Sequence, residues 1–443
     1  MFSPSLPRAG SRLSSIPLRA AALAGAALLA AAALAPSVAQ AQSPFSQFVI
    51  FGDSLSDTGN HADRSTAQTN VRFPTDFFRY TDGRYTSGPD LARFRVVYSH
   101  TFRGLWHEQL SRIFFNQDPA RPSLEGGTDY AYGDARTTAG THDNVISAVG
   151  PLVRGGIYDV TIDDMGKQVN DYLSAVGGQA DAKALYILWG ANNDLASANP
   201  TPAGVAAAVA NEVGQIQQLA IAGARNFFVY NVPPLGDTPV VAALGAATAA
   251  GANQLAAGFD ANIGPAIAQL QAGLAAAAGI NIKVTIADSF TLLRLAEANP
   301  RAYGFDNVNG FGQQAGPRDD ADRFLFWDGF HPTAAGHYQL AVEAFSDLTG
   351  TPVVQLGTSA DASSNPTLYF TRSGNDVSGD LTVRYTQTGS GSRSVVIPAG
   401  QRTVTVTGVL PTGVRRGRTI RFELVADAAY AIGVVAFRDV LIK

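Results

Sequence analysis

A serine, a histidine and an aspartate stand in this sequence at positions where they could carry out nucleophilic catalysis together. Ser54 follows the apolar run 48–51 and a Gly-Asp dipeptide, and Asp328 stands three residues before His331 in Asp-Gly-Phe-His-Pro-Thr. A serine hydroxyl is a weak nucleophile that needs a base, and a histidine oriented by a carboxylate can serve as that base. Each short motif alone is typical of an ordinary turn. Their combination leads to the hypothesis of a Ser54–His331–Asp328 triad that performs acyl transfer.

Buried strands would have to hold these residues at one edge of a sheet. Between residues 48 and 350, continuous apolar runs alternate with stretches of helical periodicity. The runs cover 48–51, 185–189, 227–230 and 282–286, and the clearest helical stretches cover 205–224 and 242–274. This alternation predicts an α/β fold with a parallel sheet covered by helices on both faces. Active sites of such sheets lie at the carboxyl ends of the strands, which is where Ser54 falls.

The pattern changes near Leu356, where short alternating runs separated by turns replace the strand–helix alternation. Residues 357–366 read Gly-Thr-Ser-Ala-Asp-Ala-Ser-Ser-Asn-Pro, a composition typical of a connecting segment. We therefore expect an α/β domain over 42–350, which would carry the proposed triad, a linker over 351–366 and a small antiparallel β-sandwich over 367–443. The change of pattern also predicts that the sandwich has a core of its own, with few contacts across the boundary.

The N-terminus has the three-part layout of a secretory signal peptide. Arg8, Arg12 and Arg19 form a basic region, the apolar run 20–35 follows, and Ala39-Gln40-Ala41 supplies a cleavage motif. The alternative is a membrane anchor, but an alanine-dominated run of this length is short for a bilayer core of roughly 30 Å. We therefore expect residues 1–41 to be a signal peptide and the mature protein to be secreted or periplasmic.

Composition excludes several other kinds of protein. The chain has 443 residues, 46% of them hydrophobic and 15% charged, which is ample material for a folded core. Its formal net charge of −4 gives no basic surplus, so we expect no nucleic-acid partner. There is no cysteine, which excludes disulfides, thiolate nucleophiles and cysteine-ligated metals. His331 and His337 do not have the i, i+4 spacing of a helical zinc pair, so we expect no metal and no cofactor.

Four sequence blocks, in order, resemble the GDSL, or SGNH, family of serine hydrolases. They are Phe-Gly-Asp-Ser-Leu-Ser-Asp-Thr-Gly-Asn at 51–60, Gly-Arg-Tyr-Thr-Ser-Gly-Pro at 83–89, Trp-Gly-Ala-Asn-Asn-Asp-Leu at 189–195 and Asp-Gly-Phe-His at 328–331. The resemblance covers about 48–350 and implies a three-layer, flavodoxin-like hydrolase fold. It also implies that Ser54 is the nucleophile, His331 the base and Asp328 the acid. By the same resemblance, the backbone N–H groups of Ser54 and Gly88 and an asparagine side chain form the oxyanion hole.

The position of that asparagine is ambiguous. Relatives usually read Gly-x-Asn-Asp, whereas this chain reads Gly-Ala-Asn-Asn-Asp at 190–194. An ungapped alignment through Trp189 and Leu195 selects Asn193, and an alignment on the glycine selects Asn192. We prefer Asn193, because moving an amide by one residue changes its direction completely.

Two further segments bear on substrate and partners. Residues 90–104 form an insert beside the oxyanion block that is rich in arginine and aromatic residues. We interpret this insert either as a partly mobile cover over an acyl pocket or as an ordinary packed loop. The C-terminal part resembles a shortened Calx-β-like module, although its arginine-rich turn at 415–418 argues against calcium.

The leading hypothesis is an exported carboxylic-ester hydrolase of the lipase or esterase type. Its expected partners are a small-molecule or lipid ester substrate, a lipid surface in transient contact, and a glycan or surface contact through the C-terminal module. One alternative is a carbohydrate O-deacetylase whose C-terminal module binds glycan. Another is a non-catalytic adhesion protein on a hydrolase fold, against which the intact Ser54, His331 and Asp328 argue.

Overall fold

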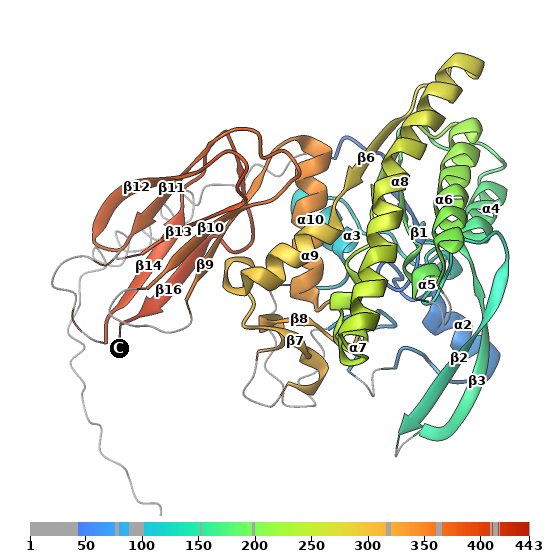
Figure 1. Cartoon of the computed structure of the whole chain (residues 1–443), viewed down its shortest axis with the longest axis horizontal. Coiled ribbons are helices and arrows are strands. Elements are labelled where there is room, and N and C mark those ends of the chain that lie inside the picture. The colour runs from blue at the N-terminus through green and yellow to red at the C-terminus, as the bar shows by residue number, and fades with distance from the viewer. Residues whose placement is uncertain are drawn as a thin grey trace, which may run out of the picture. The chain divides into compact units, whose positions relative to one another are not determined.

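A four-stranded parallel sheet forms the centre of the hydrolase part, with strand order β1-β4-β5-β6 (Figure 1). The strands are β1 (Phe48–Gly52), β4 (Leu185–Trp189), β5 (Asn226–Tyr230) and β6 (Lys283–Ala287). All five residues of β1 and of β4 are buried. Burial on both faces explains why these strands read as continuous apolar runs. The four predicted strands are confirmed, each to within about one residue.

The structure is a computed structural model that describes residues 43–75, 79–87, 102–150, 153–196, 200–315, 320–359, 366–407, 410, 415 and 417–442, with backbone only for 147–150 and 153–156. The expected signal peptide 1–41, Gly88 and residues 90–101 of the insert lie outside the described residues. No helix of the described part is both long enough and apolar enough to cross a membrane.

Successive side chains of the strands enter two hydrophobic clusters, one on each face of the sheet. In β1, Phe48 and Ile50 belong to one cluster, while Val49 and Phe51 belong to the other. The first face is covered by α3 (Trp106–Gln109), α9 (Ser289–Ala298) and α10 (Ala334–Thr349), and the second by α4 (Met165–Ala175), α6 (Pro202–Ala222) and α8 (Ala246–Ala278). The three-layer α/β fold is therefore confirmed.

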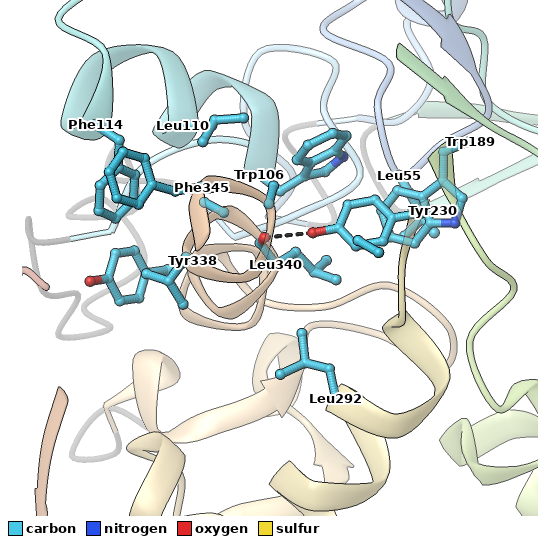
Figure 2. Packing of buried hydrophobic residues seen from close by; sticks show 14 of the residues in the cluster. Leu55, Trp106, Leu110, Phe114, Trp189, Tyr230, Leu292, Tyr338, Leu340 and Phe345 are labelled. Atoms are coloured by element: carbon cyan, nitrogen blue, oxygen red, sulfur yellow. Dashed lines mark hydrogen bonds between the residues drawn. The ribbon is translucent and has the colours of Figure 1, made fainter. Parts of the chain in front are cut away.

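Figure 2 shows the cluster on the first face, where aromatic side chains from the sheet and from α3 and α10 meet. Trp106 and Trp189 pack edge to face with ring centroids 5.9 Å apart. The buried hydroxyl of Tyr230 donates a hydrogen bond of 2.5 Å to the carbonyl of Leu340, so its one polar group is satisfied. This contact fixes α10 against the sheet.

The remaining elements of the hydrolase part connect these layers. They are the helices α2 (Asn60–Thr69), α5 (Asn192–Leu195) and α7 (Pro239–Ala243), the strands β7 (Asn307–Phe311) and β8 (Phe324–Phe326), and the short 3₁₀ or π segments η3 (Leu110–Phe114), η4 (Ser123–Glu125), η5 (Leu235–Asp237), η6 (Pro300–Tyr303), η7 (Gly312–Gln314) and η8 (Ala321–Arg323). Strands β7 and β8 pair with each other in a separate two-stranded sheet.

A long antiparallel hairpin, β2 (Thr141–Gly150) and β3 (Val153–Asp163), was not among the predicted elements (Figure 1). Its inner face buries Ile146 and Val160 in a small cluster of their own. The outer face leaves Val145 62% exposed and Ile157 76% exposed. Asp, Asn and Gly residues interrupt the alternating pattern of these strands, which explains why local sequence does not indicate them.

Two four-stranded sheets form the C-terminal part, with orders β13-β10-β9-β15 and β12-β11-β14-β16. The strands are β9 (Val353–Thr358), β10 (Leu368–Arg372), β11 (Leu381–Gln387), β12 (Ser390–Ile397), β13 (Thr403–Val406), β14 (Thr419–Leu424), β15 (Ala431–Ile432) and β16 (Phe437–Leu441). One hydrophobic cluster collects inward-facing residues of both sheets. The predicted C-terminal β region is confirmed, with the difference that β15 pairs with β9 in parallel.

Strand β9 lies in the first half of the segment for which the sequence predicted a linker, 351–366. The strand's first five residues are buried, and it pairs with β10 and β15. Val353 joins the cluster around α10, while Val354 and Leu356 join the C-terminal cluster. The sequence does not indicate this strand because Gln355 and Gly357 interrupt its apolar run.

The two parts also share polar contacts, contrary to the expectation of separate cores. Arg402 donates two hydrogen bonds of 2.7 Å to the carboxylate of Glu343, which is fully buried on α10. Tyr338, also on α10, accepts a hydrogen bond of 2.8 Å from the backbone N–H of Val434. Residues 40–443 accordingly form one compact unit. The C-terminal strands therefore support the helix that follows His331.

Candidate active site

Ser54 lies in a tight turn directly after strand β1. A Cβ on Gly52 would lie 2.6 Å from the carbonyl oxygen of Trp189, so the end of β1 approaches β4 too closely for any larger residue. The backbone carbonyl of Asp53 accepts from the N–H groups of Ser56 and Asp57, at 3.0 and 3.1 Å. These bonds turn the chain immediately after the strand and hold Ser54 at the carboxyl end of the sheet.

The carboxylate of Asp57 organises the rest of this block. It accepts four backbone N–H groups, from Gly59 at 2.8 Å, Asn60 at 2.7 Å, His61 at 3.1 Å and Gly133 at 2.8 Å. Burial raises the pKa of Asp57 to about 6, although the hydrogen bonds from these amides lower it. The bonds cap the start of α2 and tie the segment around Gly133 to the serine loop.

The structure brings the three predicted residues together in one hydrogen-bonded path. The Ser54 hydroxyl lies 2.8 Å from His331 Nε2, and His331 Nδ1 lies 2.7 Å from Asp328 Oδ2. An ionised Asp328 accepts from Nδ1–H, which leaves Nε2 free to accept the proton of the Ser54 hydroxyl. Ser54 and His331 are 277 positions apart in the chain, so only the fold can make this contact.

Asp328 is held as a carboxylate by several donors. Its Oδ1 accepts the backbone N–H groups of Phe330 at 2.8 Å and His331 at 2.7 Å. Its Oδ2 accepts the hydroxyl of Tyr80 at 2.6 Å, in addition to the imidazole. Burial alone would raise the pKa of Asp328, but the charge of His331 and these hydrogen bonds outweigh it and lower the pKa to about 2.

Two tyrosines that support the path were missed by the sequence analysis. Tyr80 bonds to Asp328, which is 248 positions away. The ring of Tyr85 packs on the His331 imidazole with centroids 4.8 Å apart, and its hydroxyl lies 2.5 Å from His61 Nδ1. Tyr85 stands inside the block 83–89 that marks the expected oxyanion loop, but no local pattern shows that its ring contacts the histidine. Together the two tyrosines restrict the orientation of the histidine–aspartate pair.

The segment before Gly88 is fastened to the histidine loop. Thr86 Oγ1 donates to the carbonyl of Pro332 at 3.0 Å, and Ser87 Oγ accepts the N–H of Ala334 at 2.8 Å. Gly88 itself lies outside the described residues, so its place in an oxyanion hole stays a prediction. Its two preceding neighbours are nevertheless bonded within three residues of His331.

The two candidate asparagines both line the cavity at Ser54 but have different partners. Asn192 Nδ2 donates to Asp53 Oδ2 at 2.8 Å, and Asp53 is the residue directly before Ser54. Asn193 Nδ2 instead donates to the carbonyl of Ala135 at 3.0 Å. The bond to Asp53 ties the Asn192 amide to the serine loop, so the contacts favour Asn192 over the residue that the ungapped alignment prefers.

A cavity of about 500 Å³ opens at Ser54 and His331. On one side it is bounded by Asn144, Val145 and Ile146 of hairpin strand β2. On the other side it is bounded by Leu292 of α9 and Leu340 of α10, two side chains that are labelled in Figure 2. Its size is within the range of roughly 300–1,000 Å³ that is usual for small-molecule sites, and its inner wall is apolar.

Among the described residues, no cluster of histidine and acidic side chains could hold a metal ion. A hydroxyl, an imidazole and a carboxylate in series, beside an amide donor and an apolar cavity, can attack a carbonyl carbon and stabilise the resulting oxyanion.

Comparison with known proteins gives the class of enzyme. Residues 48–344 match the family of GDSL-like Lipase/Acylhydrolase proteins. The chain belongs to this family of serine ester hydrolases, as the fold and the four sequence blocks led us to expect.

Individual relatives are similar over much of the chain. Esterase EstA of Pseudomonas aeruginosa is 30% identical over 359 residues, which cover 74% of this chain and 50% of that protein. A GDSL esterase/lipase of Arabidopsis thaliana is 27% identical over 333 residues, covering 69% of this chain and 90% of the plant protein. An uncharacterized protein of Pseudomonas putida, from the trpE-trpG intergenic region, is 27% identical over 330 residues. The matched part spans about half the length of these Pseudomonas relatives.

Proposed function

We propose that this protein is an exported carboxylic-ester hydrolase that forms an acyl-enzyme on Ser54. The observation that carries the proposal is the unbroken hydrogen-bonded path from Ser54 through His331 to Asp328, located at the mouth of an apolar cavity. Membership of the family of serine ester hydrolases supports the same chemistry.

The reaction proceeds in two halves. Ser54 Oγ attacks the ester carbonyl carbon while its proton moves to His331 Nε2, and the oxyanion forms. Collapse of this intermediate breaks the bond to the alcohol, which leaves with the proton from Nε2. Water then attacks the acyl-enzyme with His331 again acting as base, and the carboxylic acid is released with Ser54 restored. Asp328 stabilises the imidazolium in both halves.

The oxyanion is stabilised by three donors in this proposal. They are the backbone N–H groups of Ser54 and Gly88 and the side-chain amide of Asn192. The bond from Asn192 to Asp53 supports this choice, because Asp53 precedes the nucleophile and fixes the amide beside it. An amide has two N–H groups, so the bond to Asp53 leaves the second available to the oxyanion.

Apolar acyl esters are the substrate class that the cavity favours. Leu292, Leu325 and Leu340 bound its inner part, and all three are buried. An acetyl group is too small to use such a space, so the cavity favours an esterase or lipase over the alternative of a sugar deacetylase. A non-catalytic adhesion role is disfavoured by the intact Ser54–His331–Asp328 path and by the family.

A series of p-nitrophenyl esters tests the proposed function. We expect kcat/KM to rise from acetate to hexanoate and octanoate, because each added methylene buries apolar surface among the leucines. Acetate as the best substrate, together with release of acetate from acetylated xylan, would favour the deacetylase. Absence of hydrolysis across the whole series would contradict the proposal.

The pH dependence should report the ionisation of His331. Burial alone lowers its pKa, but the charge of Asp328 outweighs burial and raises the pKa above its ordinary value of 6.5. Only the neutral imidazole accepts the Ser54 proton, so kcat/KM should fall as the pH decreases through a value above 6.5. In Asp328→Asn the negative charge beside His331 is absent. The acidic limb of the kcat/KM profile should therefore move to lower pH, and kcat should fall. Profiles of kcat/KM on one soluble ester check both shifts, and an unmoved limb in Asp328→Asn would contradict the pairing.

The proposal that the protein is exported depends on its N-terminal segment. The basic region, the apolar run 20–35 and the cleavage motif at 39–41 support a signal peptide and a secreted or periplasmic location. Transient contact with a lipid surface, and a glycan contact through the C-terminal strands, stay predictions.

A further inference from the structure

A second, larger cavity adjoins the first and has no role in the mechanism above. It measures about 930 Å³ and lies between α7, the N-terminal half of α8 and the start of α6. Helices α6 and α8 pack against each other along this side of the sheet (Figure 1). Among the described residues that line the cavity, most are apolar, three are uncharged polar residues and none is charged. A hollow of this size and composition is suited to an apolar ligand.

The two cavities meet at the histidine loop. Ala196, Leu235 and Phe330 line both of them. Phe330 stands between Asp328 and His331, and its side chain is 47% exposed. The backbone N–H of Val240 donates to the carbonyl of Gly329 at 3.1 Å, which joins helix α7 to this loop. The second cavity is therefore bounded by the loop that carries the catalytic histidine.

The stretch of chain that forms α7 and the first half of α8, beside the second cavity, carries no charged residue. No Asp, Glu, Lys, Arg or His occurs between Asp237 and Asp260, a stretch that includes all of α7 and the first half of α8. Much of this stretch is nevertheless exposed, and Leu244 is 67% exposed. The water-facing side of a surface helix is normally rich in charged residues. Their absence leaves a surface over which an alkyl chain can lie without desolvating a charged group.

The chemistry of the leaving group indicates which part of an ester would lie there. The departing alcohol must receive its proton from His331 Nε2, so it leaves on the imidazole side of Ser54. The second cavity opens on that side through Phe330, whereas the leucine-lined cavity runs inward between α9 and α10. We propose that the second cavity binds an alkyl chain on the alcohol side of the substrate. The substrates would then be esters with apolar groups on both sides of the scissile bond, an inference that rests on the proposed function.

Helix α8 offers a matched pair of glycines for a test. Gly251 lines the second cavity, and a Cβ built on it meets no atom within 4 Å, so a side chain can begin there without a clash, and we expect a phenylalanine to fill part of the cavity. Gly273 lies on the same helix with equally open surroundings and is not among the residues lining the cavity. The two positions are separated by about 33 Å along the helix. Replacing glycine in a helix does not by itself destabilise it.

The experiment compares methyl hexanoate with hexyl hexanoate, which have the same acyl group and differ in the alcohol. Each buried methylene strengthens binding by about fourfold, so wild type should prefer the hexyl ester by at least about tenfold in kcat/KM. Gly251→Phe should reduce this preference by about tenfold while keeping the rate on methyl hexanoate within about twofold. Gly273→Phe should behave as wild type on both esters.

The outcomes distinguish a failure of the proposed alcohol-chain site in the second cavity from a failure of the proposed function. A wild type without preference for the hexyl ester, or a Gly251→Phe protein with an unchanged preference, overturns the alcohol-chain site and leaves the esterase standing. Loss of the preference for methyl hexanoate over methyl acetate in Gly251→Phe would place the acyl chain in the second cavity and also overturns the assignment. A wild type that hydrolyses neither ester overturns the proposed function together with the inference.

Discussion

Ser54→Ala is expected to lower kcat by roughly 10⁴–10⁶-fold while leaving the fold intact. The expected loss is large because the hydroxyl supplies the attacking atom, and no neighbouring group can replace it. The fold should persist because the turn around Ser54 is held by the carbonyl and carboxylate of Asp53 and not by the Ser54 side chain. Hydrolysis of a soluble p-nitrophenyl ester and the melting temperature measure the two effects separately.

A second serine in the same block provides the control. Ser56 is buried, and its hydroxyl accepts from the indole N–H of Trp106 at 3.3 Å, away from His331. Ser56→Ala should cost some stability and retain most of the activity. If Ser54→Ala kept more than a few per cent of wild-type kcat, Ser54 would not be the nucleophile.

Asn192→Ala should reduce kcat by roughly 10²–10³-fold, with a smaller change in KM. The amide donor acts mainly where negative charge develops, so its loss affects the transition state more than substrate binding. Asn193→Ala is the matched variant, since it removes the same amide one position later. It should be milder, because the amide of Asn193 is held at the carbonyl of Ala135 and not at Asp53, the residue that precedes the nucleophile.

Measuring both variants on one soluble ester decides between the two alignments. Melting temperatures are needed beside the rates, because Asn192 also bonds to Asp53 and its removal can loosen the serine loop. The opposite order, with Asn193→Ala crippled and Asn192→Ala close to wild type, would restore the donor that the ungapped alignment prefers.

The central sheet could be predicted because each of its strands is buried on both faces. Burial on both sides requires apolar residues at every position, so β1 and β4 stand out as uninterrupted runs. In the described part of the hairpin β2–β3, buried side chains such as Ile146 and Val160 alternate with exposed ones, and both strands contain polar and glycine residues, so their sequence signal is weak. Strand β9 is buried as well, but Gln355 and Gly357 interrupt its apolar run, so the sequence does not indicate a strand there.

The candidate site likewise contains residues that the sequence predicts and residues that only the fold brings together. Ser54, His331 and Asp328 stand in compact motifs, so their positions could be named before their contacts were known. Tyr80 does not belong to a recognisable sequence motif. Its hydrogen bond to Asp328 exists only because the fold brings together residues that are 248 positions apart. The partners of the Asn192 and Asn193 amides likewise depend on the loop geometry after β4, which no alignment can supply.

Covalent labelling tests the central claim most directly. A fluorophosphonate reacts with an activated serine and leaves a stable adduct, which digestion and mass spectrometry assign to one residue. We expect one adduct, on Ser54, which is absent in Ser54→Ala and forms much more slowly in His331→Ala because the base is missing. An adduct on a different serine, or an enzyme that hydrolyses esters while Ser54 stays unlabelled, would contradict the role of Ser54 as the nucleophile.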